Sequence, residues 1–391
     1  MRFPEFSGEW EIYPLTDFMS FKNGMNPDAK RFGRGTKFIS VMDILNNQFI
    51  CYDNIRASVE VVDGDIETYG VNYGDILFQR SSETLEDVGQ ANVYLDSKPA
   101  VFGGFVIRGK SKSNYYPMFF RYLLASPTAR KKIIVKGAGA QHFNIGQDGL
   151  SKVCLNIPSI QEQEKIAKLF ECIDTRIATQ NKIIDKLQSL IKGLIDDIIT
   201  PQCEQCVAFE TLYSKAGEGG TPTTSNVEFY ENGNIPFVKI DDLGDKYLLA
   251  NKDYITELGL KKSSAWLIPV NSIIYSNGAT IGAISINKYP ICTKQGILGI
   301  VPNSNIDVEY LYYFMRSSYF QKEVERVVTE GTMRTAYLKD INHIKCPIPD
   351  LDKQKEISHT LSALSFKEDI ESQLLQKYQI QKQYLLSQMF I

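Results

Sequence analysis

The chain has 391 residues, of which 43% are apolar and 23% charged, and its formal net charge is −3. This balance is ordinary for a folded globular protein and argues against a generally basic nucleic-acid binder. The length predicts two domains with connecting segments. No apolar run approaches the roughly 18 residues of a membrane span, residues 1–5 do not begin a signal peptide, and the seven cysteines are scattered. We therefore expect a cytoplasmic protein with reduced thiols.

Residues 1–158 predict a first mixed α/β domain. Short apolar or alternating runs at 75–78, 100–102 and 105–107 predict strands, with Gly, Asn and Asp between them. An aromatic-rich segment at 117–124 then predicts a helix whose aromatic side chains belong to the core. A glycine-containing loop, 137–142, follows this helix.

Residues 159–201 predict one long helix with a narrow apolar stripe. Ser159 and Glu162 form the Ser-x-x-Glu pattern of a capping box, and Pro201 is expected to end the helix. About 40 residues at ~1.5 Å each give a rod of roughly 60 Å. The stripe follows an a/d heptad register, which predicts a coiled-coil seam containing one polar position, Gln180. The apolar seam residues are Ile166, Phe170, Ile173, Ile177, Ile184, Leu187, Ile191, Leu194 and Ile198.

Residues 202–349 predict a second mixed α/β domain, and residues 350–391 a second long helix. Strands are expected at 272–275, 283–286 and 297–301, and an aromatic helix at 308–315 precedes a glycine-containing loop at 331–334. The seam of the C-terminal helix is less regular, because Glu368, Glu371 and Lys382 stand where apolar residues are expected. The polar stretch 367–373 could open the seam, shift it, or face a separate subunit. The apolar seam residues here are Ile357, Leu361, Leu364, Leu375, Tyr378, Leu385 and Met389.

The second half of the chain repeats the first. The segment 157–166, Ile-Pro-Ser-Ile-Gln-Glu-Gln-Glu-Lys-Ile, returns as 348–357, Ile-Pro-Asp-Leu-Asp-Lys-Gln-Lys-Glu-Ile, at the start of the second long helix. Because each helix follows its domain in the same way, an antiparallel pair of helices would place the two domains at opposite ends. In such an arrangement each domain could bind one of two separated parts of a single partner. The alternative is a pair of ordinary packing helices inside one compact domain.

Basic residues are segregated although the net charge is negative. Residues 97–147 contain no Asp or Glu but nine Lys or Arg, and residues 258–306 contain no acid and four Lys. A basic face of this kind could follow DNA phosphates. The alternative is that a buried, sheet-rich segment simply excludes acidic residues.

The order of these features resembles the specificity subunit of a type I restriction–modification system. The pattern Pro-x-x-x-Glu-Gln-x-x-Ile of that family is met by Pro158, Glu162, Gln163 and Ile166, while the second copy has Lys353 in place of the glutamate. Further matches are Gly219-Gly220-Thr221-Pro222, the segment 233–237 and the ending 385–390. The first opening, 22–27, departs from Gly-Thr-Pro, so its early loops could be built differently.

The resemblance implies an α+β protein with an internal repeat, in which two similar target-recognition domains are separated by two long antiparallel coiled-coil helices. Each domain would read one half of a split, asymmetric double-stranded DNA sequence, and the helix pair would set the spacer. The chain itself would be non-catalytic and hold no cofactor or metal. Methylation subunits would carry S-adenosylmethionine and methylate adenine N6, and a restriction motor-nuclease subunit would cleave DNA.

Base readout needs Arg, Lys, Asn or Gln at groove edges, with further cations on phosphates. The candidates in the first domain are Gln79, Arg80, Lys110, Lys112, Lys131, Lys132, Lys136, Gln141 and Asn144. The candidates in the second domain are Lys261, Lys262, Asn277, Thr280, Lys294, Gln295 and Arg334. Gln79-Arg80 and Asn277 follow equivalent predicted strands, which favours a shared role.

Two other functional classes stay open at this point. Asn234-Ile235-Pro236-Phe237 resembles the adenine-gripping loop of a DNA methyltransferase but lacks its second proline, and no glycine-rich turn precedes it to hold S-adenosylmethionine. Cys203-Glu204-Gln205-Cys206 has no second Cys pair or nearby His for zinc, and 137–140 does not complete a dinucleotide fingerprint. The remaining class is a dumbbell scaffold that bridges two protein partners without contacting DNA.

Overall fold

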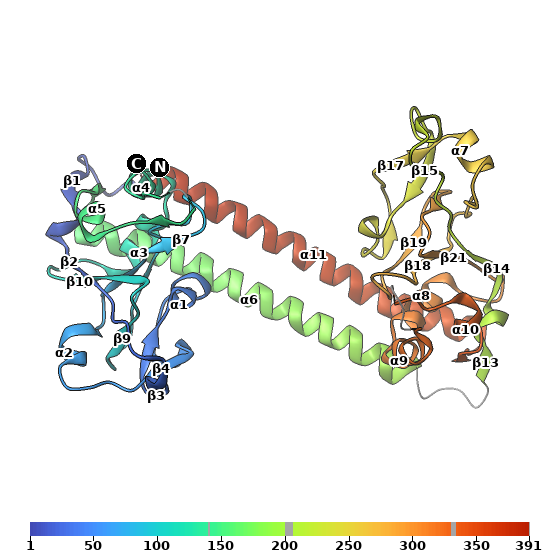
Figure 1. Cartoon of the computed structure of the whole chain (residues 1–391), viewed down its shortest axis with the longest axis horizontal. Helices are drawn as coiled ribbons and strands as arrows, with labels where there is room; N and C mark the ends of the chain where they lie inside the picture. The colour runs from blue at the N-terminus through green and yellow to red at the C-terminus, as the bar shows by residue number, and fades with distance from the viewer. Residues whose placement is uncertain (140, 200–205, 330–333, 391) are drawn as a thin grey trace. The chain divides into compact units, whose positions relative to one another are not determined.

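The computed structural model describes residues 1–139, 141–199, 206–329 and 334–390. The chain divides into two compact units. Unit 1 comprises Met1–Asn181 with Gln373–Ile391, and unit 2 comprises Lys182–Ser372. Each unit combines β-sheets with short helices and includes part of both long helices (Figure 1). The prediction of mixed α/β domains with two long helices is therefore confirmed.

The strands of unit 1 are β1 (Glu11–Pro14), β2 (Met19–Asn23), β3 (Phe32–Ile39), β4 (Ala57–Val59), β5 (Gly70–Val71), β6 (Ile76–Gln79), β7 (Ser81–Ser82), β8 (Ala91–Val93), β9 (Ala100–Phe102), β10 (Val106–Ser111), β11 (Phe143–Asn144) and β12 (Cys154–Ile157). Its short helices are α1 (Val41–Asn46), α2 (Asp65–Tyr69), α3 (Pro117–Ala125), α4 (Pro127–Ile134) and α5 (Gln147–Ser151). The long helices are α6 (Ile160–Ile199) and α11 (Leu351–Met389).

The central sheet of unit 1 has the strand order β2-β10-β6-β8, and a second sheet has the order β4-β3-β9-β5. Strand β6 is buried on both faces. Ile76 and Phe78 pack into the core formed with α3, α4 and the ends of α6 and α11, whereas Leu77 packs into a smaller core on the other side. Because successive strand side chains point to opposite faces, an uninterrupted apolar run is what such a strand requires.

The strands of unit 2 are β13 (Cys206–Ala208), β14 (Tyr213–Glu218), β15 (Ile235–Val238), β16 (Tyr247–Leu248), β17 (Asp253–Ile255), β18 (Ile273–Ser276), β19 (Ile284–Asn287), β20 (Cys292–Thr293), β21 (Ile297–Pro302) and β22 (Lys345–Pro347). Its short helices are α7 (Glu257–Lys261), α8 (Val308–Arg316), α9 (Ser318–Val327) and α10 (Leu338–Ile341).

The main sheet of unit 2 has the order β14-β21-β18-β19-β16, and a second sheet has the order β17-β15-β20. Strand β18 repeats the behaviour of β6, since Ile273 and Tyr275 enter the larger core with α8 and α9 while Ile274 enters a smaller one. The six strands and two aromatic helices predicted from the sequence lie within one residue of these bounds, except that β10 extends four residues beyond the predicted end at 107.

A buried glutamine joins the start of each long helix to the start of the aromatic helix of its unit. Gln163 donates from Nε2 to the Pro158 carbonyl (3.0 Å) and accepts at Oε1 from the Tyr116 N–H (3.1 Å), just before α3. Gln354 donates to the Pro349 carbonyl (2.8 Å) and accepts from the Asp307 N–H (2.9 Å), just before α8. The two glutamines are 3% and 1% exposed. The glutamine shared by the two repeated segments therefore fixes the exit direction of each long helix.

The predicted capping box at the start of α6 is half correct. Ser159 Oγ accepts from the Glu162 N–H at 3.4 Å, as expected. The Glu162 carboxylate, however, accepts two bonds of 2.7 Å from Arg2 and one of 3.2 Å from Trp10 Nε1. A bidentate guanidinium pair is stronger than the return bond to a backbone amide, which explains the difference.

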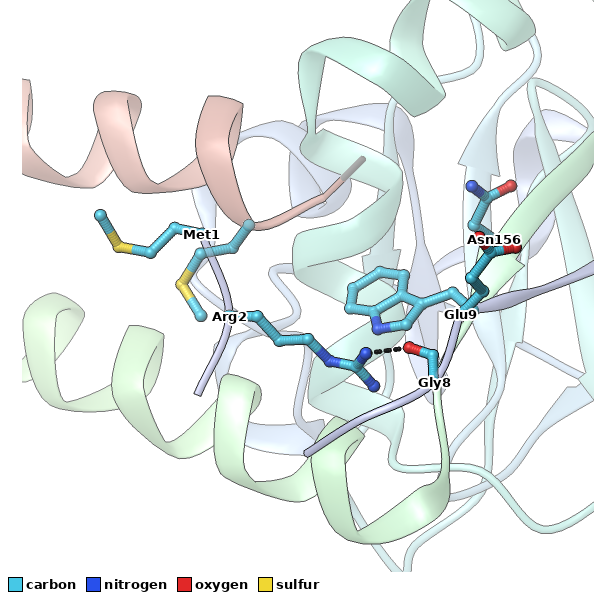
Figure 2. Close-up of a pocket in the computed structure, with 7 residues that line it drawn as sticks. Met1, Arg2, Gly8, Glu9 and Asn156 are labelled. Carbon is cyan, nitrogen blue, oxygen red and sulfur yellow. Dashed lines mark hydrogen bonds between the residues drawn. The ribbon is translucent and has the colours of Figure 1, made fainter. Parts of the chain in front are cut away.

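The N-terminal segment consequently lies against the helix ends of unit 1. Arg2 also donates to the Gly8 carbonyl, as Figure 2 shows. The Met1 amino group donates to the Gln388 carbonyl of α11 at 2.5 Å. A pocket of about 330 Å³ lies here, lined by Met1, Arg2, Gly8, Glu9, Trp10, Asn156 and Met389 (Figure 2).

Within unit 1, α6 and α11 contact each other with opposite chain directions. The Phe170 and Phe390 rings stack with centroids 5.7 Å apart, and Asp174 pairs with Lys382 at 2.5 Å. Residue numbers therefore rise along α6 as they fall along α11. The described end of α6 is Ile199, whereas Pro201 lies outside the described residues.

Within unit 2, Ile191 and Ile195 of α6 share a core with Ile357 and Leu361 of α11. Every predicted apolar seam residue of the two helices is buried or partly buried, and Ala167, Ile195 and Leu386 are buried in addition. These extra positions widen the stripe beyond strict a/d spacing because the helix ends pack on the domains as well as on each other.

Two glutamates of the polar stretch of α11 have polar partners. Glu368 accepts from Gln188 Nε2 of α6 at 2.7 Å, and Glu371 is 8% exposed and paired with Lys367 of the same helix at 2.5 Å. Lys367, Asp369 and Ile370 are exposed, so an opened seam, a shifted seam and a face for a separate subunit all stay predictions.

Among the described residues, no helix is both long and apolar enough to cross a membrane, and no three His, Cys, Asp or Glu side chains lie close enough to hold a metal ion.

We predict that Gln163→Leu loosens the start of α3 and of α6. The substitution leaves a buried N–H and a buried carbonyl without their partner, and each unsatisfied group costs about 1–3 kcal/mol. Hydrogen exchange in the full chain should therefore speed up at residues 116–125 and 158–166. The matched control is Gln161→Leu, two residues earlier and exposed. Equal exchange in the two variants would contradict the role given to Gln163.

Candidate nucleic-acid interface

Three segments that are distant in sequence meet at the end of strand β6 in unit 1. The Arg80 N–H donates to the Phe105 carbonyl at 2.8 Å, and the Arg80 carbonyl accepts from the Ile145 N–H at 2.9 Å. Strand β7 pairs with β11 beside this point, and the Ser81 hydroxyl contacts the Asn144 side chain. The strand end, the loop before β10 and the loop after α4 thus form one junction.

Unit 2 contains the same junction at the end of β18. The Asn277 N–H donates to the Gly296 carbonyl at 3.1 Å, and the Asn277 carbonyl accepts from the Ala336 N–H at 2.9 Å. Gly296 precedes β21 as Phe105 precedes β10, and Ala336 follows α9 as Ile145 follows α4. Hydrogen bonding therefore makes Arg80 and Asn277 corresponding positions.

The opening segments of the two domains also take corresponding places. The Gly24 N–H donates to the Val106 carbonyl at 3.1 Å, and the Gly219 N–H donates to the Ile297 carbonyl at 2.8 Å. A Cβ atom on Gly24 would lie 2.0 Å from the Gly103 carbonyl oxygen, and one on Gly219 would lie 2.1 Å from the Thr293 carbonyl oxygen. Glycine is required by this close backbone approach. The departure from Gly-Thr-Pro at 22–27 therefore does not change this anchoring contact.

Some candidate residues of unit 1 are exposed at the junction and one is not. Asn144 and Gln141 are exposed, and Arg80 is partly buried with Nη1 donating to the Gly104 carbonyl at 3.3 Å. Gln79 is only 5% exposed, and its Nε2 donates to the Ser81 carbonyl at 2.9 Å. The amide is enclosed and holds the turn in this conformation, and contact of Gln79 with a base edge stays a prediction.

The lysine candidates of unit 1 are not gathered at the junction. Lys110 and Lys112 are exposed at the opposite end of β10, beyond the residue pair Val106–Gln79. Lys131 is exposed on α4, and Lys136 is exposed two residues beyond that helix. Lys132 instead donates to the Cys154 carbonyl of β12 at 3.0 Å.

Three arginines of the acid-free stretch 97–147 serve the fold. Arg108 donates to the Gly70 carbonyl, Arg121 Nε donates to Asn92 Oδ1 at 3.0 Å, and Arg130 donates to the Glu86 (2.8 Å) and Val88 (2.6 Å) carbonyls. Burial lowers the pKa of all three guanidinium groups. The stretch is therefore a mixture of inward-facing structural arginines and outward-facing lysines, and contact of these lysines with DNA phosphates stays a prediction.

In unit 2, the exposed candidates near the junction are Thr280, Lys294, Gln295 and Arg334, of which Arg334 pairs with Glu325. Asn277 is 1% exposed and donates from Nδ2 to the Ala336 carbonyl at 3.2 Å. Like Gln79, it holds the junction together, and its contact with a base stays a prediction. Lys261 and Lys262 are exposed at the end of α7, in a different part of the unit.

Sequence reasoning missed an exposed aromatic residue at the junction of unit 1. Phe105 is 69% exposed and borders an apolar pocket of about 390 Å³. The pocket is lined by residues 25–27, 40–42 and 103–106 with Phe32 and Phe38. The flanking pair Gly103-Gly104 was the available signal, since glycines before a lone aromatic residue are typical of a turn that presents a side chain.

The segment 234–237, which resembled the adenine-gripping loop of a methyltransferase, lies in the core of unit 2. Ile235 and Phe237 of the sequence 234–237 are 8% and 1% exposed inside β15, so this segment is a core strand and not a loop that grips a base. Cys203 and Ala140 lie outside the described residues, as do residues 331–333 of the second glycine-containing loop.

Comparisons with known proteins agree with this architecture. The model of the family described as "Type I restriction modification DNA specificity domain" matches the chain twice, at residues 7–189 and 214–378. The type I restriction enzyme MjaVIII specificity subunit of Methanocaldococcus jannaschii is 23% identical, over 98% of this chain and 91% of its own length.

Two solved structures share the fold. A chain from a structure of type I R-M complex assembly and conformational transition has a TM-score of 0.63 and 13% identity, covering 98% of this chain and 97% of that one. The type I restriction–modification S subunit of M. genitalium has a TM-score of 0.57 and 14% identity, covering 100% of this chain and 99% of that one. With two family-model matches that together span most of its length, the chain belongs to the type I restriction–modification DNA specificity family.

Proposed function

We propose that this specificity subunit reads a bipartite, asymmetric double-stranded DNA site, with one half of the site read by each family-matched domain. The observation that carries the proposal is the junction built twice, around Arg80 in unit 1 and around Asn277 in unit 2. Each junction presents exposed polar side chains beside it, including Asn144 in unit 1 and Gln295 in unit 2. Two domains that share this backbone geometry but carry different exposed side chains would recognise two different half-sites.

Base contacts are assigned to the exposed or partly exposed side chains of each junction, and phosphate contacts to lysines elsewhere on the units. In unit 1 the base-reading candidates are Arg80, Gln141 and Asn144. In unit 2 they are Thr280, Gln295 and Arg334. The exposed Lys131, Lys136 and Lys294 are placed to meet phosphates, which carry no sequence information but add affinity that falls with salt.

The spacer between the half-sites is assigned to α6 and α11 acting as an antiparallel coiled coil. Three contacts support this pairing: Phe170 with Phe390, Asp174 with Lys382, and Gln188 with Glu368. Along all three, α6 numbers rise as α11 numbers fall. A helix of 40 residues without interruption is stiff enough to make the spacer a geometric property of the protein.

The chemistry of the system is assigned to partner subunits in the cytoplasm. Methylation subunits would bring S-adenosylmethionine and modify adenine, and a motor-nuclease subunit would bring cleavage. The M. jannaschii relative is named as a subunit of a type I restriction enzyme. Exposed apolar side chains on α11 of unit 1, Ile380 (68% exposed) and Tyr384 (55% exposed), suit a surface that another subunit covers.

We predict that Arg80→Gln alters recognition of one half-site only. A well-placed arginine contact to guanine contributes about 1–3 kcal/mol of discrimination, so affinity should fall roughly fivefold or more. The measurement is the methylated sequence motif and the DNA affinity of the assembled methylation complex. Lys110→Gln, at the other end of β10, serves as the control and should leave the motif unchanged. A motif altered in both halves, or in neither, would count against the assignment.

We further predict that shortening both long helices by one heptad shortens the spacer. Removing 177–183 from α6 and 373–379 from α11 preserves the register set by Asp174 and Lys382, which lie just outside the removed segments. Seven residues correspond to ~10 Å, or about three base pairs at the helical repeat of DNA. Motif mapping should then show the same half-sites with a spacer about three base pairs shorter. The variant with the deletion in α6 alone should fail to assemble with its partner subunits. An unchanged spacer in the double-deletion variant would exclude the proposal that the two helices set the spacer length.

A further inference from the structure

An apolar pocket lies beside Phe105 in unit 1. The pocket adjoins the junction directly, because the Arg80 side chain donates to the carbonyl of Gly104, the residue before Phe105. An apolar pocket and an exposed aromatic ring are out of place on a surface that only follows phosphates, since contact with phosphate oxygens needs donors and positive charge.

The loop that carries Phe105 is fixed by its own hydrogen bonds. The Val106 N–H donates to the Gly103 carbonyl at 2.9 Å, and the Gly103 N–H donates to the Ile39 carbonyl at 3.0 Å. A Cβ atom on Gly103 would lie 2.7 Å from the Phe38 ring, and one on Gly104 would lie 2.0 Å from Asn26 Oδ1. The glycines therefore allow the turn to pack closely against Phe38 and Asn26. This packing holds the Phe105 ring in a defined position.

DNA offers few apolar groups to such a pocket. In the major groove the bases present hydrogen-bond donors and acceptors, and the exception is the C5-methyl group of thymine. We propose that Phe105 and the pocket beside it recognise a thymine methyl group in the first half-site, while Arg80 reads or holds the neighbouring position. This inference rests on the proposed function and names a specificity-determining residue within it.

The second unit lacks this device at the corresponding position. Gly296 takes the place of Phe105 in the junction, since its carbonyl accepts the Asn277 N–H as that of Phe105 accepts the Arg80 N–H. We therefore expect methyl recognition through this position in the first half-site alone. Deoxyuridine substitutions in the second half-site then serve as a comparison within the same experiment.

The test uses the full chain assembled with its methylation subunits and duplexes carrying the mapped target sequence. Each thymine in turn is replaced by deoxyuridine, which removes the methyl group and leaves every hydrogen-bonding group in place. Burial of one methyl group is worth about 0.8 kcal/mol, so one substitution in the first half-site should weaken binding by wild type about fourfold. Binding by Phe105→Ala should be weaker by a similar factor on the thymine duplex and should not weaken further on the deoxyuridine duplex. Phe105→Leu, which keeps an apolar side chain, should retain the sensitivity.

The matched control is Tyr73→Ala, an aromatic residue 62% exposed in the same unit and located before β6, at the other end from Arg80. It should behave as wild type on every duplex. The inference would be overturned if no deoxyuridine substitution in the first half-site weakened binding by wild type, or if the full deoxyuridine effect persisted in Phe105→Ala. It would also be overturned if Phe105→Ala bent DNA less than wild type while wild type showed no sensitivity to the methyl group, because Phe105 would then be a wedge between base steps. Failure of the proposed function would look different, because wild type would then show no preference for the mapped duplex over unrelated DNA.

Discussion

The structure of each unit depends on one buried glutamine. Gln163 and Gln354 each join three things: the Ile-Pro turn that ends the domain, the first turn of a long helix, and the first turn of the aromatic helix that packs on the main sheet. A buried amide with both of its polar atoms satisfied is costly to disrupt and permits one orientation. The direction of each long helix is thereby tied to the position of the sheet, and the loops at the strand ends are placed with respect to that helix.

The residues that fix the backbone are not the residues assigned to recognition. Backbone hydrogen bonds at Arg80 and Asn277 are the same in both units, and the glycines at 24 and 219 allow the same close approach. The outward side chains differ, with Phe105 in one unit where Gly296 stands in the other. A specificity subunit gains from this separation, because surface residues can change the base that is read without altering the geometry that sets where reading occurs.

The sequence predicted structure well where a periodic apolar pattern coincided with a repeated local motif. The heptad stripes predicted both long helices, and the repeated Ile-Pro and Gln positions located their starts. It could not show that the Glu162 carboxylate would be taken by Arg2 and Trp10, which lie more than 150 residues away. It also could not separate Arg108, Arg121 and Arg130, whose donors are used by backbone carbonyls and one side chain of the fold, from the exposed lysines around them. Charge alone does not reveal which cations face inward. Residue type likewise does not show that the amides of Gln79 and Asn277 are enclosed.

The central claim is that this chain determines which bipartite DNA sequence its system recognises. The most direct measurement is a genome-wide map of N6-methyladenine in cells with and without the chain, with the neighbouring methylation subunit expressed in both. We expect one split motif, made of two half-sites separated by a fixed spacer, that is lost when the chain is removed. An unchanged map under those conditions would contradict DNA reading and favour a scaffold that bridges protein partners.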